Sequence, residues 1–421
     1  MQHSEIEYKL KEHRLGHGFY RPNYSGFGLA NLPPSILASL GCRWDGPAPL
    51  NRNVFPIDSG RNTVVLILVD ALGWNLLKKS RNQIGHLMSL MNDFTPMPLT
   101  TVFPSTTSTV LTTLNTATTP AKHGIVGYSM YIKELGAICN MLDFKIINAP
   151  KDESIFEKGF APDMILGVPT IYQRLLNQGV QSYVLTKNYL LNSGLSRATH
   201  AGAGAIGYVD VGDMFVILRK LLEREVNRPK YVFVYWPSVD TTSHTFGPWS
   251  EETLAEMRSF FFSFGEEFLS KVSSEAKRDM LVLITGDHGH SSIRNGGVYD
   301  VLSDKYMMNM LTLPPTGDSR ASFLHLKNGK VEEAIEYLSG MADNGFHSVL
   351  ANDLRKEELL GSDALKPGLL DKLGDLLVLP EAGRAIFYPF KNEKTFTQKG
   401  SHAGLTDDEL FVPLFSVDFG P

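Results

Sequence analysis

Four continuous apolar runs constrain the fold of this chain more than any other feature of its sequence. They span residues 63–69, 182–186, 231–236 and 280–285. Strands that are buried on both faces of a parallel sheet have this unbroken apolar character. Helical patterns separate the runs, at residues 168–178, 211–226 and 250–275. The alternation predicts an α/β fold, a three-layer sandwich in which a central, mostly parallel sheet has helices on both faces.

The 421 residues divide into four predicted segments. Residues 1–60 are rich in Gly, Pro, Asn and Ser, and we expect an N-terminal arm packed on the core. Residues 61–289 and 381–421 are predicted to form the two parts of the catalytic α/β core. Residues 290–380 interrupt the rhythm with a charged helical stretch, so a smaller inserted subdomain or lid is expected there. Further strand candidates lie at 321–327, 384–388 and 411–417, and shorter helices at 34–40 and 71–79.

Charge and cysteine content exclude several classes of function. The 40 basic and 45 acidic residues give a net charge of −5, which leaves no basic footprint for a nucleic-acid polymer or an anionic membrane. Two cysteines, Cys42 and Cys139, are too few for a disulfide framework and fit a reducing compartment. No apolar stretch approaches the ~20 residues of a membrane span, and no apolar signal region opens the sequence. We therefore expect a cytoplasmic protein that acts on a small molecule; its oligomeric state is not predicted.

Carboxylates and histidines follow three of the predicted strands. Asp70 ends the first apolar run, Asp240 and His244 follow the third, and Asp287-His288 follows the fourth. Ligands of open α/β sheets bind outside the carboxyl ends of the strands, so these side chains are expected to face one crevice. Residues four apart lie on one face of a helical turn, so Asp240 and His244 can reach one cation. Carboxylates and imidazoles are ligands for zinc or manganese, and the set predicts a two-metal hydrolytic site.

Several of these residues also have a structural alternative. Asp70 could cap the helix predicted at 71–79. His402 lies in a loop, where a lone histidine is usually exposed; it is included because the ion near Asp240 would otherwise lack a third protein ligand. For His290, a contact with substrate, support of a ligand and an exposed surface position all stay open.

Four hydroxyl-bearing residues follow Pro104, namely Ser105, Thr106, Thr107 and Ser108. The stretch is typical of a helix N-terminus, where hydroxyls cap free amides. The same place suits a nucleophile, because the helix potential and a divalent cation both lower the pKa of a hydroxyl. The free amides can hold an anionic oxygen of a phosphate or sulfate. Residue types and spacing leave the choice among the four hydroxyls open.

The order of these motifs resembles the alkaline phosphatase superfamily and, within it, the type I phosphodiesterase/nucleotide pyrophosphatase branch. The resemblance covers about residues 62–415, with 290–380 poorly matched, and it implies that Thr107 is the nucleophile. It also implies two metal sites, one formed by Asp240, His244 and His402. The other would be formed by Asp70, Asp287, His288 and the Thr107 hydroxyl. The motifs that carry the resemblance are Val69-Asp70, Phe103-Pro-Ser-Thr-Thr107, His123-Gly-Ile-Val, Asp240 with His244, Asp287-His288-Gly and His402.

The activity that the resemblance implies is two-metal hydrolysis of phosphodiester or pyrophosphate bonds in nucleotide-like substrates, through a covalent phospho-threonine. The cofactors would be two divalent ions, zinc or alternatively manganese. Two positions depart from the family pattern. Tyr128 replaces an asparagine that hydrogen-bonds a phosphate oxygen, and is expected to contact substrate; Thr106 replaces a lysine beside the nucleophile.

Other activities on the same scaffold are a phosphomonoesterase or a phosphonate hydrolase. The basic residues nearest to Thr107 in sequence are Arg81 and Lys122, and this distance favours a diester or pyrophosphate over a doubly charged monoester. A sulfatase is disfavoured because Thr107 lacks the Cys/Ser-x-Pro-x-Arg context. The non-enzyme alternative is a catalytically silent metal-binding protein, although all seven expected ligand groups are present.

Overall fold

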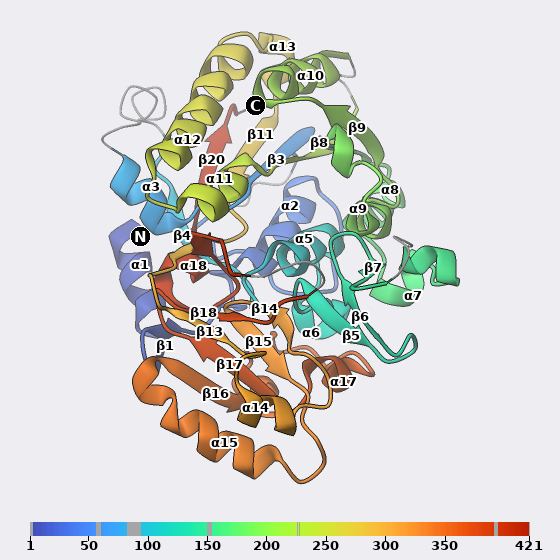
Figure 1. The fold of residues 1–421 in the computed structure, drawn as a ribbon. Coiled ribbons are helices and arrows are strands. Elements are labelled where there is room, and N and C mark those ends of the chain that lie inside the picture. The colour runs from blue at the N-terminus through green and yellow to red at the C-terminus, as the bar shows by residue number, and fades with distance from the viewer. Residues whose placement is uncertain are drawn as a thin grey trace.

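The computed structural model describes residues 3–55, 60–81, 94–149, 154–224, 226, 228–390 and 395–420. Within these ranges the chain forms two seven-stranded sheets, one in the upper half of Figure 1 and one in the lower half. None of the helices in the described ranges has the length and apolar character that a bilayer crossing needs.

The central sheet confirms the predicted α/β fold. All of its strands run in one direction except β20, which is antiparallel to both of its neighbours. The four apolar runs become β3, β8, β10 and β11, and every residue of β3, β10 and β11 is buried. The strand order is β4 (Met97–Thr100), β20 (Phe411–Asp418), β11 (Met280–Thr285), β3 (Thr63–Val69), β10 (Lys230–Trp236), β8 (Gln181–Lys187) and β9 (Gly204–Tyr208).

Helices cover both faces of this sheet, as predicted. Tyr231 and Trp236 of β10 point to opposite faces because side chains alternate along a strand. Tyr231 stacks on Tyr172 of α8 (Ile171–Leu176), and Trp236 stacks on Phe260 of α12 (Glu251–Ser263), with ring centroids 6.0 and 5.1 Å apart. The α8 face also carries α2 (Leu32–Ser39), α5 (Thr107–Thr116) and α9 (Gly194–Thr199), and the α12 face carries α10 (Val211–Arg224) and α13 (Ser274–Lys277) (Figure 1).

The second sheet is antiparallel throughout. Residues 290–380 supply four of its strands, and residues 129–146 supply the other three, joined where Gly317 pairs with Ser129. The sheet is therefore not confined to the segment expected as an insertion. Its order is β16 (Phe346–Leu350), β17 (Leu376–Pro380), β15 (Ala321–Leu324), β14 (Thr316–Asp318), β5 (Ser129–Ile132), β6 (Ala137–Asn140) and β7 (Lys145–Ile146).

Short strand pairs and helices connect the two sheets. The pair β12 (Ser291–Ser292) with β19 (Gly400–Ser401) brings two distant segments together beside the central sheet. The N-terminal segment packs on the core through buried residues of α1 (His3–Lys11) and through a bridge from Phe19 to Thr406. The remaining strands are β1 (Arg14–Gly16), β2 (Phe19–Tyr20), β13 (Val298–Asp300) and β18 (Ala385–Phe387). The remaining α-helices are α3 (Trp74–Ser80), α6 (Pro120–His123), α7 (Pro162–Leu166), α11 (Ser238–Phe246), α14 (Lys305–Met310), α15 (Val331–Gly340), α16 (Asp353–Lys356), α17 (Leu369–Leu373) and α18 (Asp407–Leu410).

Candidate active site

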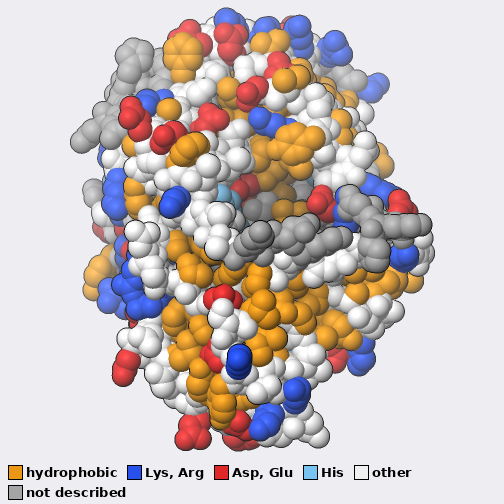
Figure 2. Space-filling view, in the orientation of Figure 1, with side chains coloured by type: hydrophobic (Ala, Val, Ile, Leu, Met, Phe, Trp, Pro, Cys, Tyr) orange, Lys and Arg blue, Asp and Glu red, His pale blue; other side chains and the backbone are white. Residues whose placement is uncertain are grey.

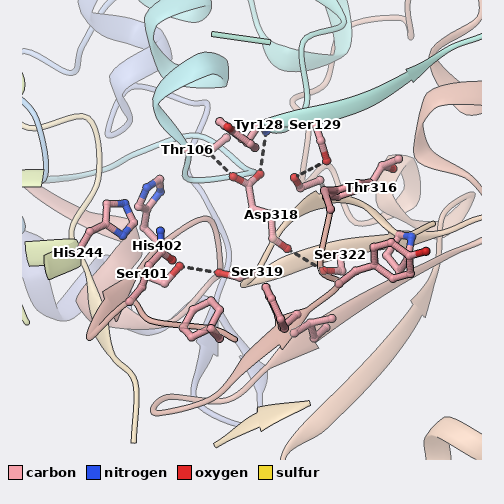
Figure 3. A pocket seen from close by; sticks show the side chains of 18 of the residues that line it. Thr106, Tyr128, Ser129, His244, Thr316, Asp318, Ser319, Ser322, Ser401 and His402 are labelled. Carbon is pink, nitrogen blue, oxygen red and sulfur yellow. Dashed lines mark hydrogen bonds between the residues drawn. The ribbon is translucent and has the colours of Figure 1, made fainter. Parts of the chain in front are cut away.

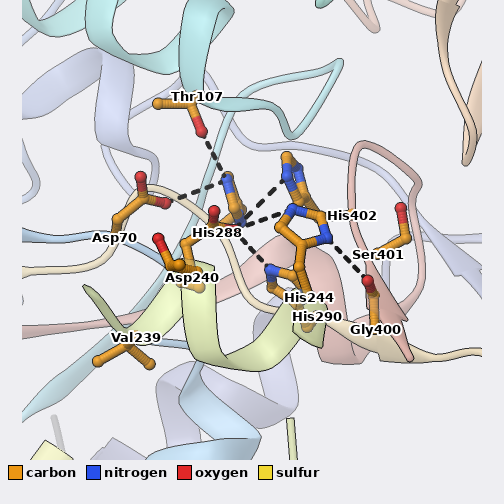
Figure 4. Close-up of polar contacts among 12 residues, drawn as sticks. Asp70, Thr107, Val239, Asp240, His244, His288, His290, Gly400, Ser401 and His402 are labelled. Atoms are coloured by element: carbon orange, nitrogen blue, oxygen red, sulfur yellow. Dashed lines mark hydrogen bonds and ion pairs between the residues drawn. The ribbon is translucent and has the colours of Figure 1, made fainter. Parts of the chain in front are cut away.

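Three neighbouring strands, β11, β3 and β10, end at the same edge of the central sheet. Each strand is followed directly by candidate ligands, because parallel strands place their carboxyl ends side by side. A loop that leaves β19 adds His402 from the far end of the sequence. Figure 2 shows this face of the molecule hollowed between the two sheets, with a histidine visible in the hollow. The predicted ligands that meet there are Asp70, Asp240, His244, Asp287, His288 and His402. Figure 4 labels all of them except Asp287.

The first group of candidate ligands is Asp70, Asp287 and His288, whose ligand atoms lie within 4.8 Å of one another. His288 Nε2 is 3.5 Å from Asp70 Oδ1, 3.3 Å from Asp287 Oδ2 and 3.2 Å from Thr107 Oγ1. Asp70 Oδ1 and Asp287 Oδ2 are buried and have no hydrogen-bond partner among the described residues. Buried carboxylate oxygens without a donor are costly unless a cation neutralises them. The group therefore fits a divalent metal ion.

The protein fixes one oxygen of each carboxylate in this group and leaves the other facing the cluster. The Tyr235 hydroxyl donates to Asp70 Oδ2. The backbone amides of Ala71 and His288 donate to Asp287 Oδ1, both at 2.9 Å. Burial and the neighbouring Asp287 carboxylate raise the pKa of Asp70 well above its usual range. The two carboxylates repel each other until a positive charge binds between them.

The second group gathers around Asp240 on α11. Its Oδ1 lies 3.3 Å from His244 Nε2, 3.7 Å from His402 Nε2 and 2.7 Å from His290 Nε2. Although burial raises it, the His244 and His290 imidazoles hold the pKa of Asp240 well below its usual range. Burial and the nearby His288 lower the pKa of His402, and burial lowers the pKa of His290 to about 4. The lowered pKa values of His402 and His290 favour neutral rings, and neutral imidazole beside ionised carboxylate is the state that metal binding requires.

Backbone carbonyls orient three of the imidazoles. Nδ1 of His244 lies 2.8 Å from the Gly400 oxygen, and Nδ1 of His402 lies 3.0 Å from the Ser105 oxygen. Nδ1 of His288 lies 3.2 Å from the Gly289 oxygen. A carbonyl at Nδ1 places the proton there and leaves the Nε2 lone pair for a metal. All three Nε2 atoms belong to the two groups above.

The four hydroxyls before and within α5 differ in where they point. Ser105 Oγ donates to the Gly404 oxygen at 2.7 Å, and Ser108 Oγ donates to the Gly127 oxygen at 2.8 Å. Thr106, the residue before α5, donates its hydroxyl to Asp318 at 2.9 Å and makes no cap bond to the helix. Of the four side-chain hydroxyls, only that of Thr107 lies against a candidate ligand, His288. The geometry therefore favours Thr107 among the four hydroxyls that residue spacing had left open as candidates for the nucleophile.

A cavity of about 430 Å³ opens beside Thr107, lined by residues of the second sheet, of α5 and α11, and of β18, β19 and nearby loops. Figure 3 shows Asp318 of β14 at its centre. Its aromatic wall consists of Tyr128, Phe387, Tyr388, Phe390 and Phe396. Among the described residues that line it there is no lysine or arginine.

Tyr128 lines this cavity, as its predicted contact with substrate would require. Its side chain is 42% exposed, and its hydroxyl accepts a hydrogen bond from Asn140 Nδ2 at 2.8 Å. Its backbone amide donates to Asp318 Oδ2 at 3.0 Å. The role of Tyr128 in substrate binding stays a prediction.

Sequence reasoning missed two polar residues of the site, Asp318 and Tyr235, and left the role of a third, His290, open. Asp318 follows a glycine in an unremarkable stretch, and Tyr235 sits inside an apolar run, so neither carries a motif. Burial raises the pKa of Asp318 to about 6. His290, whose role the sequence left open, is buried at 4% exposure and belongs to the second group. The Gly-Asp-His-Gly-His spacing was the available signal for it, since that turn already held two ligands.

One further group of possible ligands lies outside the cluster. His347 Nε2 is 2.7 Å from Glu381 Oε1, and the His17 ring stacks on His347 with centroids 3.8 Å apart. This group is open to solvent, with the His17 side chain 59% exposed.

Comparisons with known proteins show the family and the fold of the chain. A family model described as type I phosphodiesterase / nucleotide pyrophosphatase matches residues 64–405. The structure of mouse ectonucleotide pyrophosphatase/phosphodiesterase 5 is similar, with a TM-score of 0.63 and 18% identity over 85% of this chain and 88% of that chain. The human protein gives a TM-score of 0.61 at 17% identity, over the same 85% and 88%. An inactive threonine-to-alanine variant of the mouse protein, in complex with AMP, gives 0.62 at 17% identity with the same coverage. No curated sequence matches significantly.

Proposed function

Because the chain belongs to the type I phosphodiesterase / nucleotide pyrophosphatase family, a family of metal-dependent hydrolases, we propose that it cleaves phosphodiester bonds with Thr107 as nucleophile and two divalent ions. The observation that carries this proposal is the pair of unpartnered oxygens, Asp70 Oδ1 and Asp287 Oδ2, that lie beside the Thr107 hydroxyl. Among the described residues, these two are the buried carboxylate oxygens that have no hydrogen-bond partner.

Asp70, Asp287, His288 and the Thr107 hydroxyl would hold one ion, and Asp240, His244 and His402 would hold the other. Zinc is the expected metal, with manganese as the alternative, because imidazole and carboxylate ligands suit both. The bound ions would supply positive charge that lowers the pKa of the Thr107 hydroxyl and neutralises the phosphate oxygens.

Thr107 Oγ1 would attack phosphorus after losing its proton, and the bond between phosphorus and the leaving alcohol would break as the new bond forms. Water then cleaves the phosphothreonine and restores the hydroxyl. The first-turn amides of α5 lack acceptors within the helix and can hold a non-bridging oxygen. The Thr106 hydroxyl does not compete for them, because it donates to Asp318. Loss of activity in the threonine-to-alanine variant of the mouse neighbour supports a threonine in this role.

The cavity favours a diester over a monoester. A monoester carries a second negative charge and needs a cationic partner, whereas the described lining residues include none and do include the Asp318 carboxylate. Burial raises the pKa of Asp318 only to about 6, so its ionised form predominates at neutral pH. The aromatic wall fits a planar group on the substrate such as a nucleobase. The AMP complex of the mouse neighbour supports a nucleotide-like substrate.

Hydrolysis of bis-p-nitrophenyl phosphate and of p-nitrophenyl phosphate tests this proposal, with zinc or manganese added and with a chelator as control. We expect faster cleavage of the diester, lost on chelation and restored by metal. Faster cleavage of the monoester would contradict the diester assignment. Absence of turnover on both esters, in protein that contains its metals, would contradict the enzymatic role.

A further inference from the structure

His290 is not among the ligands expected of the Asp240 site, yet it lies closer to Asp240 than either expected histidine. Its Nε2 is 2.7 Å from Asp240 Oδ1, against 3.3 Å for His244 and 3.7 Å for His402. Its side chain is buried, and its ring lies 4.6 Å from that of His244 and 5.0 Å from that of His402. Figure 4 shows the three rings gathered around the carboxylate.

These contacts have the spacing of ligand atoms around one small cation. Zinc binds imidazole nitrogen and carboxylate oxygen at about 2.0–2.1 Å, so neighbouring atoms of a tetrahedral set lie about 3.3 Å apart. The three distances from Asp240 Oδ1 to the imidazole nitrogens fall on both sides of that value. We propose that His290 is a fourth protein ligand of the ion held by Asp240, His244 and His402. This inference rests on the proposed two-metal function.

The backbone holds His290 in this position by close contacts that only glycine permits. A Cβ at Gly289 would meet the Asp408 oxygen at 2.0 Å. A Cβ at Gly400 would meet the Ser243 oxygen at 2.7 Å and His290 Nδ1 at 3.0 Å. The residue after His290, Ser291, pairs with Ser401 in the β12–β19 ladder. The ladder therefore fixes His290 next to the segment that carries His402.

A fourth protein ligand changes what the Asp240 site can do. Catalytic zinc sites have three protein ligands and one open position, whereas sites with four protein ligands are closed and bind metal more permanently. The Asp240 site would therefore retain its ion more tightly than a site formed by Asp240, His244 and His402 alone. The alternative role for His290 is a hydrogen bond from Nε2–H to Asp240, which would orient that carboxylate without touching the metal.

Cobalt substitution of a His290→Cys variant separates these two roles. A thiolate bound to cobalt gives an intense charge-transfer band in the near ultraviolet, which appears only when sulfur touches the metal. We expect the band in His290→Cys and not in the wild type, which already carries Cys42 and Cys139. His200→Cys is the matched control, because His200 also has a buried Nδ1 without a partner but packs against Tyr172 outside the cluster. Cobalt bound at the wild-type stoichiometry without the band would overturn the proposal.

Zinc affinity of His290→Ala and His290→Gln provides a second test that does not need a thiol. Glutamine keeps a hydrogen-bond donor for Asp240, so a purely orienting role predicts near wild-type affinity for His290→Gln. Our proposal predicts that both variants lose affinity for one of the two ions, by about tenfold or more. Equal affinity of His290→Gln and wild type would overturn it. Wild-type protein that binds no cobalt or zinc would instead contradict the proposed two-metal function itself.

Discussion

The Arg320–Glu409 pair and the candidate active site are both buried clusters of charged residues, and they differ in how completely their polar atoms are hydrogen-bonded. In the first, Arg320 and Glu409 are both fully buried and pair through two bonds, Nε to Oε1 at 2.9 Å and Nη2 to Oε2 at 2.6 Å. Arg320 Nη1 also donates to two backbone carbonyls, and Glu409 also accepts from the Gly404 amide and the Thr406 hydroxyl. No atom of this pair is left without a partner among the described residues.

In the second cluster, the candidate active site, Asp70 Oδ1 and Asp287 Oδ2 are equally buried and have no donor. Burial raises the pKa of Asp70, whereas Arg320, against the effect of burial, holds the pKa of Glu409 below its usual value. A buried charge that is paired and fully hydrogen-bonded is tolerated in the fold, whereas an unpaired one is costly until a ligand of opposite charge binds. The comparison separates a structural ion pair from a binding site without reference to any relative.

The largest effect is expected on metal affinity, when the charge of Asp287 in the candidate active site is removed. Asp287→Asn keeps the oxygen that accepts from Ala71 and His288 but replaces the unpartnered one by an amide. We expect loss of one metal ion, more than about 100-fold in affinity, with loss of diester turnover. Elemental analysis and isothermal titration measure the affinity. Metal-free Asp287→Asn should unfold within about 1 kcal/mol of the metal-free wild type, because no native hydrogen bond is lost. Wild-type metal affinity in this variant would contradict the conclusion that the unpartnered Asp287 oxygen marks a metal site.

The same carboxyl-to-amide change in the Arg320–Glu409 pair should instead lower stability and leave metal binding unchanged. Glu409→Gln leaves the buried Arg320 guanidinium without its counter-charge, and we expect a loss of about 3–5 kcal/mol in the free energy of unfolding. Metal content of the protein that remains folded should be unchanged. Urea denaturation and elemental analysis check both points. A loss below about 1 kcal/mol would show that the pair is not structural.

The Arg320–Glu409 pair also predicts that the free energy of unfolding decreases at acid pH. Because the pKa of Glu409 is lower in the folded state than in the unfolded state, the contribution of this group is present above the unfolded-state pKa. It is lost as the pH falls through the folded-state pKa. Denaturation midpoints between about pH 7 and about pH 3 should therefore fall less steeply in Glu409→Gln than in wild type. Parallel curves for the two proteins would argue against the assignment.

A smaller effect is expected at Asp318, a carboxylate that resembles Glu409 in its hydrogen bonding and Asp287 in its place near Thr107. Both of its oxygens accept hydrogen bonds, yet it faces the cavity beside Thr107. Asp318→Asn removes a negative charge near the phosphate, so we expect the ratio of monoester to diester turnover to rise by about tenfold. Asp304→Asn is the matched control, since Asp304 accepts from two tyrosine hydroxyls away from the cavity. An unchanged ratio in Asp318→Asn would remove this residue from substrate selection.

The sequence predicts what local patterns encode and misses what long-range pairing creates. The four apolar runs predict β3, β8, β10 and β11, and the residues after three of them predict most of the candidate ligands, because parallel strands bring their ends together. The β5–β14 pairing and the Arg320–Glu409 pair join segments far apart in the chain, and no local signal marks such pairings. Asp318 belongs to the same class, since it meets Thr106 across 212 residues.

The acidic residues 407–409 follow His402 closely in the sequence, but this closeness does not place them in the candidate site. Asp407 pairs with Lys11, Asp408 accepts from Asn75, and Glu409 pairs with Arg320. None of the three is part of the metal-capable groups found among the described residues. His402 itself does lie in the cluster, because β19 and β12 carry it there.

The most direct test of this account is Thr107→Ala, measured for both metal content and diester turnover. Ser108→Ala is the matched control, because its hydroxyl is one residue away and donates to the Gly127 oxygen. We predict that Thr107→Ala keeps its fold and both ions but loses more than about 10³-fold in turnover of bis-p-nitrophenyl phosphate, while Ser108→Ala stays near wild type. Near-normal turnover in Thr107→Ala would contradict the assignment of the nucleophile.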